Sequence, residues 1–142
     1  MNNFDFYIKT KLYFGKDKHL ETGKILASFG AKKVLIFIGQ GSVRKNGLLD
    51  EVTNTIKQEN IDFRVVEGIR PNPTIDLVKE FLIVAKEYQP DFLLAIGGGS
   101  VIDTAKLVSV GYYYDGDPFD FNLKKAIPVN ALPLGVILTI SA

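Results

Sequence analysis

"LLAIGGGSVIDTAK" (residues 93–106) joins an apolar run to three consecutive glycines, a serine and a helix-like segment. The same arrangement occurs earlier in "VLIFIGQGSVRKNG" (residues 34–47), where another apolar run ends in glycines and a serine. Continuous runs of Val, Ile, Leu and Phe are typical of strands that are covered on both faces of a parallel sheet. The two junctions therefore predict two buried parallel strands, each followed by a glycine turn and then by a helix.

Strand-like and helix-like segments alternate along the rest of the chain. The expected strands lie at residues 33–38, 62–68 and 91–96, with a short strand-like segment at 11–15 and a buried strand within 131–142. The expected helices lie at residues 18–29, 47–60, 75–88 and 101–114. Repeated βα units of about thirty residues predict an α/β fold, a doubly wound, mostly parallel, Rossmann-like sheet with helices on both faces.

Thr74 is the expected N-cap of the helix at 75–88, because a threonine oxygen can accept a bond from a first-turn amide. The polar segment 115–130 predicts a surface excursion rather than a linker between domains. Its aspartates resemble part of a calcium loop, but the other ligands of such a loop are missing, so we interpret them as turn residues.

The length and composition predict one ordinary domain that spans residues 1–142. Hydrophobic residues make up 46% of the chain and charged residues 23%. The 17 basic and 16 acidic side chains nearly balance, which argues against a nucleic-acid partner. No apolar stretch approaches the roughly 18 residues that a membrane-spanning helix needs.

The chain contains no cysteine, which excludes disulfides and thiolate metal sites. That composition fits a reducing compartment, and the start of the chain lacks the features of a secretory signal, so we expect a cytoplasmic location. The apolar run "ALPLGVILTISA" ends with its strand barely finished, so we expect Ala142 to be a truncation point or the limit of the ordered chain.

The turn at residues 97–100 predicts a phosphate site. Ligands of parallel α/β sheets bind at the carboxyl ends of the strands, and glycine allows a phosphate to approach the backbone closely. The amides and the dipole of the following helix favour an anion. The alternative is a capping box, with Ser100 as N-cap and Asp103 three residues on. That alternative explains three successive glycines poorly.

The turn after the strand at 33–38 predicts contacts with the adenosine ribose of a dinucleotide. An acidic residue in this turn would bind the 2′-hydroxyl of NAD(H), but residues 39–42 contain none. Arg44 and Lys45 follow the turn and would tolerate the 2′-phosphate of NADP(H). We therefore expect NADP(H) to be favoured over NAD(H), unless these two side chains are merely solvated.

Six segments together resemble the iron-containing alcohol dehydrogenase family, in particular its butanol-dehydrogenase-like branch. They are "TKLYFGK", "GQGSVRKNGLLDEV", "PNPT", "GGGSVIDTAK", "GYYYDGDPFDF" and "LPLGVILTISA". The resemblance runs along essentially the whole chain and implies the N-terminal, cofactor-binding half of such an enzyme. The implied activity is hydride transfer between a nicotinamide and a primary alcohol or aldehyde.

The resemblance also implies where the dinucleotide contacts the chain. The turn 97–100 would hold the pyrophosphate, and Asp103 would reach the nicotinamide carboxamide. Residues 40–42 would meet the adenosine ribose, with Asn72 close by and Thr139 near the cofactor. The implied cofactor-binding residues are Gln40, Gly41, Ser42, Asn72, Gly97, Gly98, Gly99, Ser100, Asp103 and Thr139.

The family implies a divalent metal, iron or zinc, held by one aspartate and three histidines of a helical domain. Those positions follow the last residue of this chain, and His19, its sole histidine, matches none of them. We therefore expect no catalytic residue and no metal ligand within the chain, and no turnover by this part alone. Family members often dimerise through the N-terminal strand region, which makes "FDFYIKTKLYFG" (residues 4–15) the expected homodimer interface.

Two alternatives stay open. The first is a polyol or glycerol-phosphate dehydrogenase of the same superfamily, which shares the glycine turn. The second is a stand-alone nucleotide-binding module without redox activity.

Overall fold

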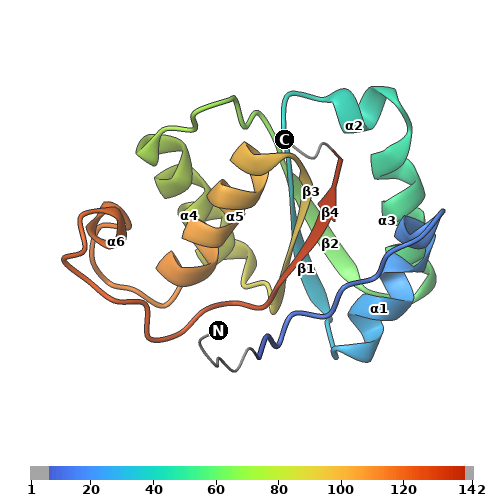
Figure 1. The fold of residues 1–142 in the computed structure, drawn as a ribbon, viewed down its shortest axis with the longest axis horizontal. Helices are drawn as coiled ribbons and strands as arrows, with labels where there is room; N and C mark the ends of the chain where they lie inside the picture. The colour runs from blue at the N-terminus through green and yellow to red at the C-terminus, as the bar shows by residue number, and fades with distance from the viewer. Residues whose placement is uncertain (1–6, 140–142) are drawn as a thin grey trace, which may run out of the picture.

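The computed structural model describes residues 7–139, and within them four strands form one parallel sheet. Its order is β2-β1-β3-β4, so the sheet grows outward in both directions from the central pair (Figure 1). The strands are β1 Lys33–Ile38, β2 Asp62–Val66, β3 Phe92–Gly97 and β4 Leu134–Leu138. This sheet with helices on both faces confirms the predicted α/β fold.

The helices pack in two layers. Helices α1 and α3 lie on one side of the sheet, and α4 and α5 lie on the other (Figure 1). The described helices are η1 Lys18–Glu21, α1 Thr22–Ser28, α2 Ser42–Lys45, α3 Leu48–Gln58, α4 Ile75–Tyr88, α5 Gly99–Gly111 and α6 Phe119–Asn122. Helix α4 has the expected bounds, and Thr74 caps it by accepting a bond from the amide of Leu77 at 3.4 Å.

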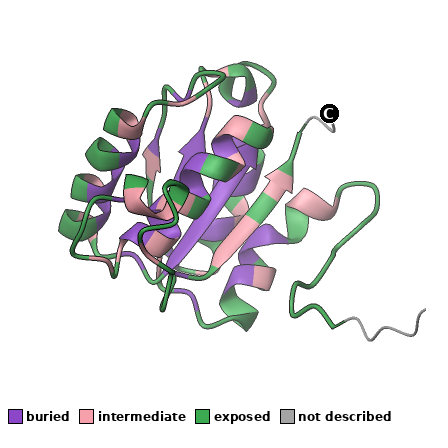
Figure 2. Cartoon of the chain, turned by 60° about the vertical axis from the view of Figure 1, so that its left-hand side comes forward, coloured by how far each residue is buried: buried purple, intermediate pink, exposed green. Residues whose placement is uncertain are grey.

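The central strands supply both hydrophobic cores because their side chains alternate between the two faces. Leu35 and Phe37 of β1 pack toward α4 and α5, in a cluster with Val108. Ile36 and Ile38 pack toward α1 and α3 on the opposite face. Figure 2 shows the result as buried central strands beneath helices whose outer surfaces are exposed. This packing holds the carboxyl ends of β1 and β3 in fixed positions.

Two expectations about strands are wrong. The segment at 11–15 is not a strand, and among its side chains Leu12 and Phe14 are 87% and 91% exposed. Its aromatic residues favour a strand, but among residues 7–139 no neighbouring strand pairs with it. The final strand is also not buried. β4 lies at the edge of the described sheet, and its Val136 and Leu138 are exposed.

The excursion at 115–130 contains α6 and otherwise runs as an irregular segment. Two of its aspartates make side-chain contacts, and one of them, Asp120, lies within α6 rather than in a turn. Asp117 accepts a bond from the Phe119 amide at 2.9 Å and from Lys79 Nζ of α4 at 2.8 Å. Asp120 accepts a bond from the Tyr114 hydroxyl at 2.8 Å. These contacts hold α6 against α4 and the end of α5.

Candidate functional site

The carboxyl edge of the sheet brings together segments that are far apart in the sequence. The amide of Thr139, just after β4, donates to the Gly97 carbonyl at the end of β3, at 3.2 Å. The two glycine turns are neighbours as well, because a Cβ on Gly39 would lie 3.7 Å from Val101 Cγ2. The turns that follow β1 and β3 therefore form one continuous edge together with Thr139.

Helix α5 begins directly at the glycine turn and points its N-terminus out of the sheet edge. Gly98 is its N-cap, in an extended conformation with φ −93° and ψ −166°, and no side chain caps the helix. The Gly98 carbonyl accepts bonds from the amides of Val101 and Ile102, both at 3.1 Å. The amides of Gly99 and Ser100 come before Val101, the first intrahelical donor. They are therefore the groups that a helix N-terminus offers to an anion.

The three successive glycines have different surroundings. A Cβ on Gly97 would lie 2.6 Å from Val101 Cγ2, so glycine is needed there for packing. A Cβ on Gly98 or on Gly99 would meet no described atom within 4 Å, and neither residue has a positive φ. Neither packing nor backbone conformation within residues 7–139 requires glycine at these two positions. Open space in front of uncapped amides is what a bound phosphate would use.

The capping-box alternative is wrong. Ser100 lies within α5 rather than at its N-cap, because the helix begins one residue earlier, at Gly99. The Ser100 carbonyl accepts a bond from Thr104 Oγ1 at 2.8 Å. Asp103 is exposed, and its nearest cation is Lys106 Nζ at 3.7 Å. The serine and the aspartate therefore do not cap the helix, and the Asp103 carboxylate lies on its exposed first turns.

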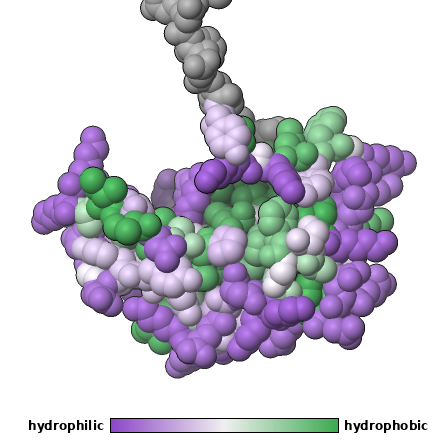
Figure 3. Space-filling model, turned by 90° about the horizontal axis from the view of Figure 1, so that it is seen from below, coloured by the Kyte–Doolittle hydropathy of each residue, from purple (hydrophilic) through white to green (hydrophobic). Residues whose placement is uncertain are grey.

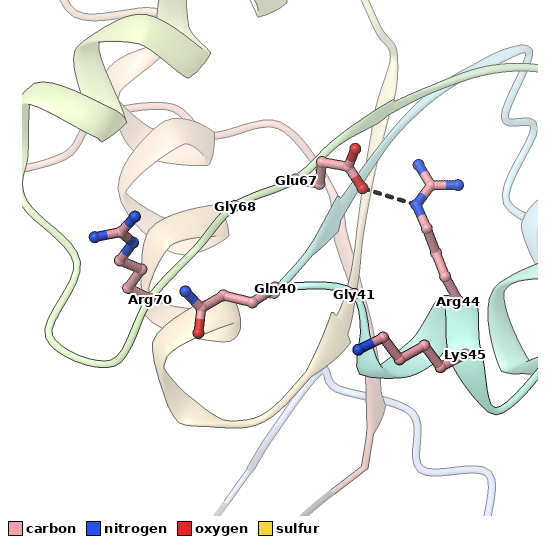
Figure 4. Close-up of a pocket in the computed structure, with 8 residues that line it drawn as sticks. Gln40, Gly41, Arg44, Lys45, Glu67, Gly68 and Arg70 are labelled. Carbon is pink, nitrogen blue, oxygen red and sulfur yellow. Dashed lines mark hydrogen bonds and ion pairs between the residues drawn. The ribbon is translucent and has the colours of Figure 1, made fainter.

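A cleft of about 410 Å³ opens where β1 and β2 end (Figure 4). The amide of Gly68 donates to the Gly39 carbonyl at 2.9 Å, which ties the two strand ends together. Gly41 has a φ of 109°, a backbone conformation that glycine adopts at little cost, and this turn leads into α2. The lining residues are Gly39, Gln40, Gly41, Arg44, Lys45, Glu67, Gly68 and Arg70.

Ionisable side chains line this cleft from both of its sides. Arg44 Nε donates to Glu67 Oε2 at 2.7 Å, and both side chains are about half exposed (49% and 54%). Lys45 of α2 and Arg70 of the β2–α4 loop add two cations (Figure 4). The cleft therefore carries a net positive charge, which suits a phosphorylated ligand.

The cleft contains only some of the residues that the sequence predicts there. Gln40 and Gly41 line it, whereas Ser42 and Asn72 are exposed and do not. Asn72 lies in the β2–α4 loop with a φ of 53°. Sequence reasoning missed Glu67 and its neighbours Gly68 and Arg70. The signal that could have found them is the end of the strand at 62–68, since parallel strands end at the same edge.

Helix α5 also borders a second, smaller cleft of about 100 Å³ between α4 and α6. Asp103 and Thr74 line it together with Leu107 and Phe119. Asp103 is thus placed beside the N-terminus of α4, on the same sheet edge as the glycine turn.

No group of three or more His, Cys, Asp or Glu side chains within residues 7–139 is arranged to hold a metal ion. The imidazole of His19 instead lies 2.8 Å from Glu51 Oε2, in a contact between η1 and α3. The described residues therefore do not fit the divalent metal that the resemblance implies. Among residues 7–139, no helix combines the length and the hydrophobicity needed to cross a bilayer.

A parallel sheet with glycine turns at adjacent strand ends defines the class of doubly wound α/β domains. Within that class the chain belongs to the iron-containing alcohol dehydrogenase family, whose model matches residues 9–142.

Two curated relatives illustrate the range of the family. The chain is 42% identical over its whole length to a probable NADH-dependent butanol dehydrogenase of Bacillus subtilis, and it covers 36% of that protein. It is 33% identical to an NADPH-dependent aldehyde reductase of Escherichia coli, again over the whole chain and 36% of the relative. The chain therefore spans about a third of the length of these proteins.

The comparison with solved structures shows the same partial coverage: this chain matches one part of a longer protein. A crystal structure of an NADH-dependent butanol dehydrogenase from Thermotoga maritima matches all of this chain with a TM-score of 0.96 and 40% identity. The match covers 36% of the Thermotoga chain.

Proposed function

We propose that this chain is the cofactor-binding part of a metal-dependent, NAD(P)-linked alcohol dehydrogenase or aldehyde reductase of the butanol-dehydrogenase-like branch. The observation that carries the proposal is the open, uncapped N-terminus of α5. Gly98 and Gly99 leave space in front of its amides that no packing or backbone requirement within residues 7–139 explains. A dinucleotide pyrophosphate supplies the anion that such amides and the helix dipole favour.

The proposed cofactor follows the sheet edge from one glycine turn to the other. The turn 97–100 binds the pyrophosphate through the amides of residues 98–100. The adenosine ribose then extends toward the cleft beside Gln40 and Gly41. We expect Ser42 and Asn72, which do not line the cleft, to contact the ribose as well. The nicotinamide extends in the other direction, toward Asp103 and Thr139, and the Asp103 carboxylate accepts a bond from the carboxamide nitrogen.

Hydride transfer would take place between the nicotinamide and a primary alcohol or aldehyde. This chain's contribution is to bind the cofactor and fix the orientation of its nicotinamide. The metal of the family would polarise the substrate oxygen when bound. Because the described residues do not fit that metal, we place its ligands and the substrate contacts in the rest of the protein. We expect this chain alone to be inactive.

We further propose that NADP(H) is favoured over NAD(H). Arg44, Lys45 and Arg70 outnumber the single carboxylate among the described residues that line the cleft. The relatives do not decide the preference, because one is named for NADH and another for NADPH. The charge of the cleft is therefore the basis of this proposal. The cytoplasmic location expected from the sequence also stays a prediction.

Isothermal titration calorimetry with AMP, NAD and NADP tests the cofactor proposal on the full-length gene product. We expect NADP to bind more tightly than NAD, and both to bind more tightly than AMP, since AMP lacks the pyrophosphate bridge. Equal, weak binding of all three ligands would favour a nucleotide-binding module without redox activity.

A substrate panel on the same protein separates the dehydrogenase classes. We expect oxidation of butanol and reduction of butyraldehyde with the preferred cofactor. Turnover confined to polyols or glycerol phosphate would assign the protein to another branch of the superfamily.

A further inference from the structure

Glu67 lies at the carboxyl end of β2, beside the turn that follows β1. The two strands pair in parallel register, with Val66 opposite Phe37. One residue further on, the Gly68 amide donates to the Gly39 carbonyl at 2.9 Å. Backbone contacts therefore hold the chain on both sides of Glu67. The sheet thus fixes the backbone of Glu67 at the cleft, and the contact with Arg44 holds its carboxylate there (Figure 4).

Glu67 is the one carboxylate among the described residues that line the cleft, and it binds the cation that lies nearest to it. Its Oε2 accepts the Nε–H bond of Arg44 at 2.7 Å. An arginine holds a phosphate most strongly through two parallel N–H bonds. Since Glu67 occupies Nε, a phosphate that approaches the Nε edge of Arg44 must compete with this carboxylate.

We propose that Glu67 is a specificity-determining residue that limits the preference of the cleft for a 2′-phosphorylated adenosine cofactor, an inference that rests on the proposed function. The carboxylate repels a 2′-phosphate and withdraws Arg44 from it. A 2′-hydroxyl in the same place meets no repulsion and can donate a hydrogen bond to the carboxylate. Glu67 thereby keeps NAD(H) usable in a cleft whose other ionisable side chains are cations.

The test is Glu67→Gln, which keeps the size of the side chain and removes its charge. Calorimetry at low salt would compare 2′,5′-adenosine diphosphate with 5′-AMP on the full-length gene product. Two ligands that differ in the 2′-phosphate report on this cleft without any turnover. We expect the affinity for the bisphosphate to rise about fivefold, and that for 5′-AMP to stay within about twofold. Added salt should reduce the gain, because the repulsion is screened.

Glu87→Gln is the matched control. Glu87 is exposed near the end of α4, at the opposite edge of the sheet, and its loss changes the net charge equally. We expect this variant to leave the ratio of the two affinities unchanged. Thermal unfolding would verify that both variants fold.

An unchanged ratio in Glu67→Gln would overturn the inference, and so would weaker binding of the bisphosphate, which would show that Glu67 orients Arg44 for the phosphate. The proposed function fails differently. It fails if the wild-type protein binds neither NAD nor NADP, and the inference then fails with it. If the wild-type protein binds both and the ratio does not respond to Glu67→Gln, the inference alone is wrong.

Discussion

Gly97, Gly98 and Gly99 are adjacent in sequence, yet packing requires glycine only at the first of these positions. The side chain of Val101 fills the space that a Cβ on Gly97 would enter. The corresponding space at Gly98 and Gly99 is open among the described residues. The sequence predicts a phosphate cradle from the row of glycines as a whole. The structure separates the one that packs from the two that face the proposed ligand.

Gly99→Ala tests this separation. Gly99 is the first residue of α5 and has an unstrained φ, so alanine should stabilise the fold by about 0.5–1 kcal/mol. The added methyl group would occupy the space of the phosphate, and the loss of one charge-assisted bond lowers the affinity for NADP about tenfold or more. Chemical denaturation and calorimetry measure the two effects separately.

Gly97→Ala provides the contrast. Its Cβ would lie 2.6 Å from Val101 Cγ2, so we expect a loss of about 1–3 kcal/mol in unfolding free energy. If a folded Gly99→Ala protein bound NADP as tightly as the wild type, the turn would not be the phosphate site.

Individual elements were predictable where the local pattern decides them. The strand at 33–38 and the helix at 75–88 have the predicted bounds, because a continuous apolar run and a capped helical stripe are local signals. The exposure of β4 and the missing strand at 11–15 depend on which strands lie beside these segments. A local sequence pattern carries no information about such neighbours. Glu67 was missed for the same reason. Its place in the cleft follows from the pairing of β2 with β1.

The contact between α4 and the segment before α6 should depend on pH. Lys79 Nζ donates to Asp117 Oδ2 at 2.8 Å, and this bond lowers the pKa of the Asp117 carboxyl, with a further contribution from the Phe119 amide. Because the folded-state pKa lies below the unfolded one, the contact stabilises the fold above the unfolded pKa. That contribution is lost as the pH falls through the folded-state value.

Carboxyl-detected NMR can follow Asp117 directly. We expect its titration midpoint to lie below the ordinary value of 3.8, and to move upward in Lys79→Gln. A midpoint that does not respond to the loss of Lys79 would show that the two side chains are not paired in solution.

At the scale of the whole molecule, apolar surface remains on the face opposite the proposed site. Figure 3 views the molecule from below and shows hydrophobic surface near the centre of this face, with hydrophilic residues around it. The segment before η1 adds exposed apolar side chains, including Ile8, Leu12 and Phe14. Residues 4–6 of the expected homodimer interface lie outside the described residues. We propose that the described part of this segment contacts a second copy of the protein.

Leu12→Ser combined with Phe14→Ser tests the proposed interface. Removing two large apolar side chains from an interface core should shift the full-length protein toward monomers. We expect the dissociation constant of the dimer to rise about tenfold or more. Sedimentation velocity measures this shift. Ile83→Ser is the control, since Ile83 of α4 is also exposed (61%). An unchanged sedimentation coefficient in the double variant would place the interface elsewhere.

A crystal structure of the full-length gene product with NADP(H) bound would locate the cofactor on this chain. We expect the pyrophosphate oxygens to lie about 3 Å from the backbone nitrogens of residues 98–100, with the adenosine ribose beside Gln40. A cofactor bound elsewhere, with these amides facing only solvent, would show that the glycine turn is not the pyrophosphate site.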